Sequence, residues 1–365
     1  MSSSILKPLV FKGRAASSNA VSRFDAHMRE AFDDGWNNLD EETPLLKTEV
    51  MVDVTKSVIN YVNSPDIPFD RTINPYRGCE HGCIYCYARP SHAYLGLSPG
   101  LDFESRLLMK PDAPDILKKE LAKSGYQCAP IALGMNTDAY QPIEREYQLT
   151  RKIIEILSEA NHPFSLVTKS ALVERDIDLI APMAKKSLAS IWLSITTLDR
   201  NIARKLEPRA AAPERRFETL QKLSAAGIPT GVMVAPMIPA LNDSDMEKIL
   251  EKAHAAGARK AGYVFLRLPL ELTPLFEEWL QQHFPLKAKH VMSLVKQSRG
   301  GKTYISEFGS RMRGQGIFAD LLATRFKHAC QKLGMDGERL NLNSQIFKVP
   351  ESWKMKKEER QMGLF

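Results

Sequence analysis

From residue 70 onward, short apolar runs of strand length alternate with stretches of helical length. The runs are apolar on both faces, which is typical of parallel strands covered on both sides. They are Arg71–Tyr76, Ile131–Asn136, Phe164–Thr168, Ser190–Thr196, Thr230–Ala235 and Tyr263–Leu268. Six such strands joined by right-handed crossovers predict an α/β fold, a partial (β/α)6 TIM-like barrel rather than a closed eight-stranded one.

Helix signals fill the intervals between these runs. The expected helices are Ile143–Ala160, Glu174–Lys185, Pro213–Ala226 and a helix that Asn242 to Ser244 can cap and that stops at Gly257. After Leu268 the alternation ends, and three further helices are expected at Thr273–His283, Ala288–Gln297 and Ile317–Lys332.

These patterns divide the chain into four parts. We expect an irregular N-terminal arm over residues 1–50 with one short helix at Asp25–Trp36, a core over 51–270, a C-terminal helical extension over 271–350, and a frayed tail over 351–365. No apolar run is long enough to cross a bilayer, and Met1–Ala20 lacks the apolar segment of a signal peptide. The default expectation is a cytoplasmic protein with no membrane partner.

Three of the five cysteines fall within eight positions, as Cys79, Cys83 and Cys86. An odd number of cysteines, crowded in this way, favours a metal or cluster site over a disulfide framework. Three thiolates can hold an iron–sulfur cubane and leave one iron open to another ligand. The alternatives are three unrelated buried cysteines, which is improbable at this spacing, a zinc site completed by His81 or His92, and a redox dithiol at Cys83 and Cys86 that leaves Cys79 unexplained.

The C-x3-C-x2-C spacing and its flanks, Asn74-Pro-Tyr-Arg-Gly-Cys79 and Cys86-Tyr-Ala-Arg-Pro90, resemble the radical S-adenosylmethionine (SAM) superfamily. Within it they resemble the spore photoproduct lyase-related, DNA repair photolyase-like branch, over about residues 50 to 335. The resemblance implies a [4Fe-4S] cluster on the three cysteines with SAM on the open iron. An electron donor such as a flavodoxin or ferredoxin would then drive cleavage of SAM to a 5′-deoxyadenosyl radical that abstracts hydrogen from a substrate.

The resemblance also assigns residues to SAM, because active sites of parallel barrels lie at the carboxyl ends of the strands. Lys169, after the third strand, matches a lysine that pairs with the SAM carboxylate in this branch. Tyr85 occupies the aromatic position whose backbone meets adenine. Asn136, Thr137 and Asp138 stand where the superfamily binds the SAM amino group, although its common Gly-Gly-Glu form is absent here.

Three further positions belong to the predicted SAM site. Ser194 and Thr196 share one face of the fourth strand, and their hydroxyls could bond the ribose or methionyl group or simply cap the strand end. Ala235, at the end of the fifth strand, would present its backbone to adenine. Tyr87 is the candidate catalytic residue, with packing as the alternative role.

Charge gives the clue to the substrate. The formal net charge of +7 is compatible with a nucleic acid or another anion, and equally with an ordinary basic surface. Two basic loops are predicted to converge at the mouth of the barrel as an anion-binding face: one carries Arg209, Arg215 and Arg216, and the other carries Arg311 and Arg313.

One departure limits the reaction. Spore photoproduct lyase has a cysteine at the end of the second strand that returns hydrogen to the product radical, whereas this chain has Gly134-Met135-Asn136 there. Cys128 and Cys330 are predicted to be buried thiols. Repair of thymine dimers by that mechanism is therefore not predicted. A radical SAM enzyme acting on a small molecule or peptide, and a non-catalytic zinc- or cluster-binding nucleic-acid module, stay open as alternatives.

Overall fold

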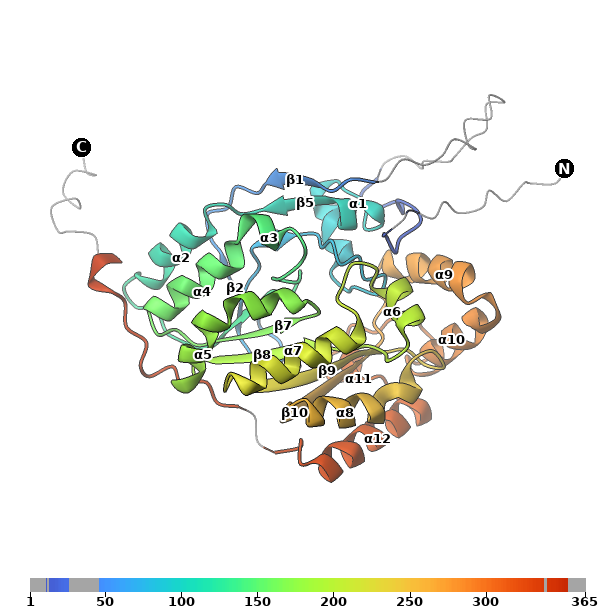
Figure 1. Cartoon of the computed structure of the whole chain (residues 1–365). Helices are drawn as coiled ribbons and strands as arrows, with labels where there is room; N and C mark the ends of the chain where they lie inside the picture. Colours follow the sequence, from blue (N-terminus) through green and yellow to red (C-terminus); the bar gives the residue numbers. More distant parts are fainter. Residues whose placement is uncertain (1–10, 12, 26–45, 338–339, 354–365) are drawn as a thin grey trace.

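The computed structural model describes residues 11, 13–25, 46–337 and 340–353, which are built around one seven-stranded sheet (Figure 1). In spatial order its strands are β10 (Lys260–Phe265), β9 (Thr230–Met237), β8 (Ala189–Ser194), β7 (Phe164–Thr168), β6 (Ile131–Leu133), β3 (Arg71–Ile73) and β2 (Ile59–Tyr61). All neighbours from β3 to β10 are parallel, and β2 adds one antiparallel strand at the edge. The prediction of six parallel strands is confirmed.

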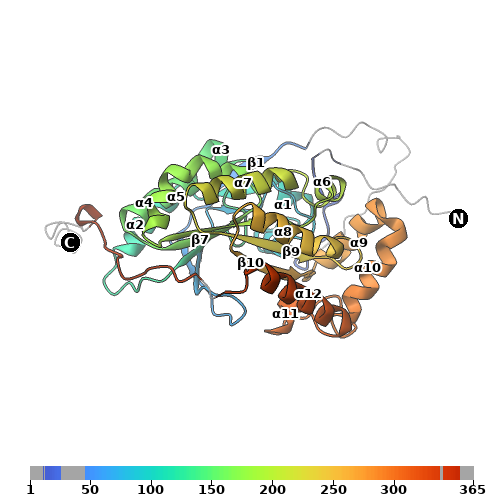
Figure 2. The ribbon, with the colours of Figure 1, turned by 60° about the horizontal axis from the view of Figure 1, so that its bottom comes forward.

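Helices cover the outer face of the sheet. Figure 2 shows α4 (Leu149–Glu159), α5 (Ile177–Lys185), α7 (Pro213–Ala225) and α8 (Met246–Ala255) on one side of it. Each buries an apolar stripe against the strands, as α4 does with Ile153, Ile154 and Leu157. The opposite face is the concave one, on which the candidate site lies.

The helix predicted at Ile143–Ala160 is in fact two helices. Gln148 has a φ of 52°, which ends α3 (Glu144–Tyr147) and starts α4. The buried Glu144 carboxylate accepts from the Thr150 N–H at 3.0 Å across this break. The other outer elements are α2 (Ala113–Leu121), η3 (Ala171–Asp176), α6 (Arg200–Leu206) and η4 (Asp243–Asp245).

A second, three-stranded sheet was not predicted. It consists of β1 (Glu49–Val52), β5 (Arg106–Met109) and β4 (Tyr76–Arg77), in the order β1-β5-β4. Together with η2 (Arg89–Leu95) and α1 (Leu101–Ser105) it frames the loop that carries the three cysteines. The expected break near residue 50 therefore falls inside a strand that pairs with the core.

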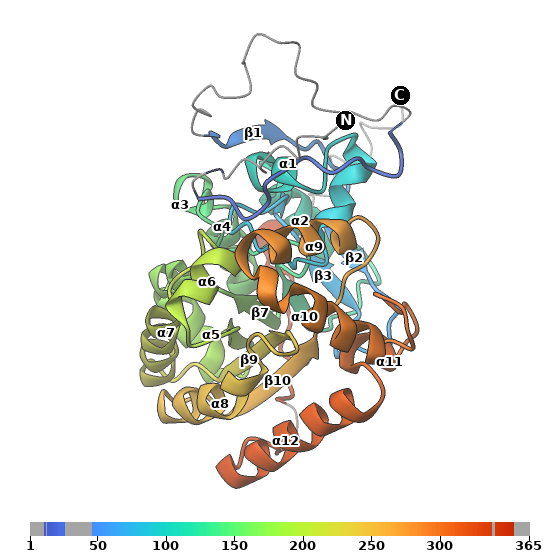
Figure 3. The same ribbon diagram turned by 90° about the vertical axis from the view of Figure 1, so that its right-hand side faces the viewer.

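The three predicted C-terminal helices lie where the sequence predicted them, as α9 (Leu272–His283), α10 (Pro285–Gln297) and α12 (Ile317–Leu333). The short α11 (Ser310–Arg313) lies in the stretch that was expected to be a loop. Figure 3 shows α9 and α10 beside α6 at one end of the molecule. Their Phe276 and Trp279 share an apolar cluster with Ile84 and Tyr85 of the cysteine loop. The C-terminal extension therefore packs against the loop that carries the three cysteines.

The chain then returns along the sheet before η5 (Glu351–Trp353). The Asn343 N–H donates to the Ser187 carbonyl at 2.8 Å, and the Lys348 N–H donates to Ala160 at 3.0 Å. Most of the helix predicted at Asp25–Trp36, and the tail from residue 354, lie outside the described residues. Within the described parts of the chain, no helix is both long and apolar enough to cross a bilayer.

Candidate active site

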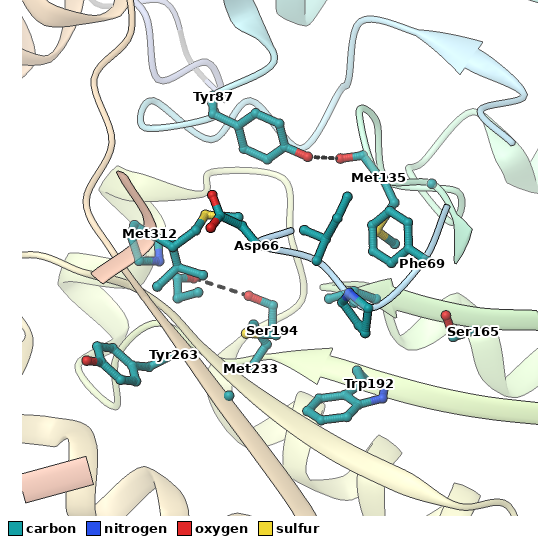
Figure 4. A pocket seen from close by; sticks show the side chains of 18 of the residues that line it. Asp66, Phe69, Tyr87, Met135, Ser165, Trp192, Ser194, Met233, Tyr263 and Met312 are labelled. Carbon is teal, nitrogen blue, oxygen red and sulfur yellow. Dashed lines mark hydrogen bonds between the residues drawn. The ribbon is translucent and has the colours of Figure 1, made fainter. Parts of the chain in front are cut away.

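A cavity of about 1830 Å³ lies against the concave face of the main sheet (Figure 4). Its walls are the inward-facing residues of β7 to β10, the cysteine loop, the segment of residues 62–69, and parts of the C-terminal extension. Pockets that hold one small molecule usually measure about 300–1,000 Å³. This cavity is large enough for a cofactor and a substrate together.

All three clustered cysteines line this cavity. Two consecutive turns shape their loop: the Gly82 N–H donates to the Cys79 carbonyl at 3.1 Å, and the Cys86 N–H donates to Cys83 at 3.1 Å. Cys79 and Cys83 are each 7% exposed, and Cys86 is half-buried. Gly82 has a φ of 66°, and a Cβ there would lie 2.6 Å from a Glu104 carboxylate oxygen, so this turn needs glycine.

Arg89, three residues after the last cysteine, holds the loop in this shape. Its fully buried guanidinium donates to the carbonyls of Gly82 at 3.0 Å and Cys83 at 2.9 Å, and it forms an ion pair with buried Glu104. Glu104 also accepts from the N–H groups of Ala15 and Ala16 in the N-terminal arm, at 3.0 and 2.9 Å. The described residues around Ala15 and Ala16 of the N-terminal arm therefore help to hold the loop.

Burial keeps the Cys79 and Cys83 thiols protonated. Burial raises the pKa of Cys79 well above its ordinary value and that of Cys83 to about 12, although Lys169 opposes the second shift. Buried thiols of this kind are protonated at neutral pH and give up their protons when a metal centre binds. Three thiols at one wall of one cavity are a donor set that fits a [4Fe-4S] cluster.

The zinc alternative would need a histidine, and both candidates contact other groups. His81 Nδ1 lies 3.2 Å from an Asp138 oxygen, and His92 Nε2 lies 2.9 Å from the Arg106 carbonyl. Within the described part of the chain, no three His, Cys, Asp or Glu side chains gather where a single metal ion could bind. A cubane distributes its thiolates over separate irons, so the cluster stays a prediction that this geometry does not test.

Of the three residues predicted to bind the SAM amino group, Asn136 has a side chain that forms no hydrogen bond with any described residue. The Asp138 carboxylate accepts from the Thr168 hydroxyl at 2.7 Å and the Lys169 N–H at 2.8 Å. Burial alone would raise the pKa of Asp138, but His81 and these hydrogen bonds hold it below its ordinary value. The Thr137 hydroxyl donates to the Tyr76 carbonyl. Asn136, in contrast, is exposed and lines the cavity.

Lys169 also lines the cavity, with Nζ 5.8 Å from the centroid of the Tyr85 ring. Burial would lower its pKa, but the neighbouring Cys83 and Glu207 raise it above the ordinary value, so the ammonium stays charged at neutral pH. Tyr85 is 7% exposed, and its hydroxyl donates to Glu207. The geometry brings these residues together beside the cysteine loop.

The polar ends of β8 and β9 bond mainly to each other. The Ser194 and Thr196 hydroxyls both donate to the Ala235 carbonyl, at 3.3 and 3.1 Å (Figure 4 shows the first). Ser194 and Ala235 line the cavity, whereas Thr196 faces the buried Glu207. These contacts are those expected if the two hydroxyls cap the end of the strand, which was the alternative to binding SAM.

Tyr87 connects two loops of the site. Its hydroxyl donates to the Met135 carbonyl, and the Arg267 guanidinium lies 5.2 Å from its ring centroid (Figure 4 shows the hydrogen bond). The ring is 44% exposed and lines the cavity. Its catalytic role stays a prediction, and its observed contacts are those of a packing residue.

The predicted arginine face does not form as expected. Arg216 is 1% exposed and forms an ion pair with equally buried Glu207. Its neighbour Arg215 turns outward and donates to Glu174 at 2.9 Å. Arg216 is engaged in a buried ion pair and Arg215 in an ion pair on the outer side of α7, and neither lines the cavity.

The other three arginines of the predicted face differ in whether they line the cavity. Arg209 pairs with Glu80 at 2.8 Å and does not line the cavity. Arg311 and Arg313 do line it, the first paired with Asp66 and the second exposed. The predicted convergence of the two loops is therefore not observed, since only the arginines of the C-terminal loop line the cavity. Anion binding by these residues stays a prediction.

The structure reveals cations that the sequence reasoning missed. Eight Lys or Arg residues line the cavity against three Asp: Arg77, Lys110, Lys169, Lys260, Arg267, Arg311, Arg313 and Lys327 against Asp66, Asp138 and Asp336. Arg267 is the second residue after β10 and lies near the end of the predicted strand Tyr263–Leu268, so its position in the sequence indicates a place at the mouth of the barrel. The cavity as a whole favours an anionic ligand.

Comparisons with known proteins agree with this geometry. A model of the radical SAM superfamily matches residues 73–253. An uncharacterized protein of Mycobacterium tuberculosis is 37% identical over 233 residues, which cover 63% of this chain and 68% of that protein. A radical SAM Nα-GlyT isomerase of Pseudomonas phage M6 is 24% identical over 232 residues, or 62% of this chain and 46% of that one.

Among solved structures, spore photoproduct lyase complexed with dinucleoside spore photoproduct has the same fold. The TM-score is 0.55 at 16% identity, over 78% of this chain and 79% of the lyase. At that identity the likeness concerns the fold alone. Together with the family match and the cysteine motif, it leads to one conclusion: the chain belongs to the radical SAM superfamily and is a radical SAM enzyme.

Proposed function

We propose that Cys79, Cys83 and Cys86 hold a [4Fe-4S] cluster, that SAM binds beside it, and that the enzyme abstracts hydrogen from a nucleic-acid substrate. The observation that supports this most is that the three cysteines, Lys169 and a surplus of cations line a single cavity. Bound together, the cluster and SAM supply a 5′-deoxyadenosyl radical. A flavodoxin or ferredoxin as electron donor stays a prediction.

The residues of the chain would bind and orient SAM. Lys169 carries a positive charge at the end of β7, where it can pair with the SAM carboxylate. The exposed Asn136 amide oxygen can accept from the SAM ammonium. Tyr85 and Ala235 would present backbone groups to adenine, and the Tyr85 hydroxyl is held away from the ligand by Glu207.

Replacing Lys169 with methionine should weaken SAM binding by roughly ten- to a hundredfold. Loss of one partner of a charge-assisted hydrogen bond costs about 1.5–3 kcal/mol, which corresponds to that range. Equilibrium binding of SAM to the anaerobically reconstituted variant measures this. The exposed Lys252 on α8 supplies the matched control, Lys252→Met. An unchanged SAM affinity in Lys169→Met, with the cluster intact, would refute the assignment.

The nucleic-acid part of the proposal depends on the charge of the cavity. Lys260, Arg313 and Lys327 line it and form no ion pair with any described residue. A structure of spore photoproduct lyase, which shares the fold, holds a dinucleoside. A small molecule or a peptide is the second candidate substrate, in which case these cations would serve solubility alone.

Changing Lys260, Arg313 and Lys327 together to glutamine should weaken binding of single-stranded DNA and flatten its dependence on salt. Each phosphate contact on a single strand contributes about −0.7 to the log–log slope, so the slope should fall in magnitude by about 2. Binding measured by anisotropy across a salt series tests this. The control changes Lys119, Lys152 and Lys248, which are exposed on the outer helices. Absent or salt-independent binding would rule out the nucleic acid.

A further inference from the structure

Trp192 lies on the floor of the cavity, away from the cysteine loop. It points to the concave face from the middle of β8, between Ser190 and Ser194, and all three residues line the cavity. Ser194 is at the carboxyl end of β8. Trp192, two residues earlier, is the next side chain on the same face and lies closer to the amino end of the strand. Figure 4 shows its ring along the strands, with Ser165 and Met233 to either side.

On one side of Trp192, strands β9 and β10 lack side chains where this ring lies. A Cβ on Gly231 of β9 would be 2.5 Å from Trp192 Cδ2, 2.6 Å from Cε3 and 2.8 Å from Cε2. A Cβ on Gly262 of β10 would be 3.0 Å from the methyl carbon of Met233 and 3.9 Å from Trp192 Cζ3. The indole therefore lies flat across β9 and reaches toward β10, with one face on the backbone of Gly231.

Neither glycine is needed for backbone conformation. Gly231 and Gly262 are within strands, and neither has the positive φ that favours glycine in turns. Glycine inside a strand weakens the strand and often marks a close approach by another group. Here that group is the Trp192 ring, so the two positions form a notch that keeps the indole parallel to the sheet.

The other face of the ring is left for a ligand. Trp192 is half-buried, and among the described side chains neither an aromatic ring nor a cation stacks on it. Its indole N–H and the hydroxyls of Ser165 and Ser190 form no hydrogen bond within the described part of the chain, although all three residues line the cavity. A flat apolar surface with hydrogen-bonding groups at its edge suits a planar heteroaromatic ring.

We infer that Trp192 is the stacking platform for a base of the substrate, and that the substrate is a single-stranded or flipped-out nucleotide. This rests on the proposed function, which it makes more specific. A base fits better than an aromatic amino acid for two reasons. The hydroxyls of Ser165 and Ser190 can bond ring heteroatoms, and the cations of the cavity can pair with the attached phosphates. The segment of residues 62–69, with Phe69, forms a further wall of the cavity.

The test uses the full chain without SAM and two probes: a single-stranded DNA 12-mer of mixed sequence, and the same backbone with abasic sites throughout. Stacking on Trp192 should quench its fluorescence with the first probe only. Trp192→Leu should abolish the quenching and weaken 12-mer binding by about five- to a hundredfold, with no change for the abasic strand. The matched control is Trp353→Leu, because Trp353 does not line the cavity.

Gly231→Ala supplies a second variant that keeps the indole. Its added methyl group would displace the ring, so it should weaken 12-mer binding in the same direction. Equal 12-mer affinity in Trp192→Leu and wild type would overturn the inference. So would an equal loss of SAM affinity in Trp192→Leu, which would assign the platform to the adenine of SAM. Formation of 5′-deoxyadenosine by the wild type tests the proposed function separately.

Discussion

Alanine in place of Cys79, Cys83 or Cys86 is expected to abolish the iron–sulfur cluster. The three cysteines line one wall of the cavity, and each would bind a different iron of a cubane whose fourth iron is open. Loss of one thiolate leaves a second open iron beside solvent and a centre with too few ligands. Iron content after anaerobic reconstitution should fall from about four per chain to near zero in each variant.

The matched control changes the two remaining cysteines, Cys128→Ser with Cys330→Ser. Burial raises the pKa of each to about 11, so both are thiols at neutral pH. Cys128 is half-buried before β6, and Cys330 is buried on α12. This double variant should keep its iron. Full iron retention in all three alanine variants, or its loss in the double variant, would mean that the ligand set is misassigned.

Removing the Arg216 guanidinium is expected to cost about 3–5 kcal/mol of unfolding free energy. Arg216 and Glu207 are both 1% exposed, and Arg216 also donates to the carbonyls of Ser194 and Ala211, each at 2.7 Å. Arg216→Met would leave the Glu207 carboxylate buried without its cation, which is the costly case for an ion pair. Urea unfolding of the cluster-free protein measures the difference.

The adjacent position gives the control. Arg215 pairs with Glu174 on the outer side of the same helix and is 36% exposed, so Arg215→Met should cost at most about 1 kcal/mol. Adding Glu207→Leu to Arg216→Met should recover part of the loss, because the buried carboxylate is then removed together with its cation. Equal losses for Arg215→Met and Arg216→Met would show that this ion pair contributes no more than a surface one.

The same two arginines show where prediction from sequence failed. The buried positions of α7 are Pro213, Arg216, Thr219, Leu220 and Leu223, which follow the helical period. That period places Arg216 on the inner face and Arg215 off it. The sequence did not indicate that the Glu207 carboxylate is buried beside Arg216, and this carboxylate is what stabilises an arginine on the inner face. Counting charges along the loop therefore predicted a basic surface where a buried ion pair exists.

The fold was predictable where local sequence determines it. Strands such as β7 and β8 are apolar runs bounded by turns, and their parallel pairing follows from the helices between them. The second sheet was not predictable in this way, because β1 pairs with β5 from Glu49 to Arg106, across 57 residues of sequence. Its strands have four residues or fewer, too short for a clear pattern.

The candidate site, like the fold, could be predicted from sequence only where its residues follow a local pattern. The cysteine spacing is local, and Lys169 follows its strand directly, so both could be read from the sequence. Trp192 alternates with two serines, which indicates one face of β8. That Gly231 leaves space for its ring depends on the register between β8 and β9, where Trp192 lies opposite Gly231. Such pairings exist only in the folded sheet.

Formation of 5′-deoxyadenosine tests the central claim most directly. The anaerobically reconstituted full chain is incubated with SAM and dithionite, and the products are separated and identified by mass. The wild type should form 5′-deoxyadenosine, and Cys83→Ala should form none. A wild-type protein that carries about four irons per chain, binds SAM and forms no 5′-deoxyadenosine would contradict the account.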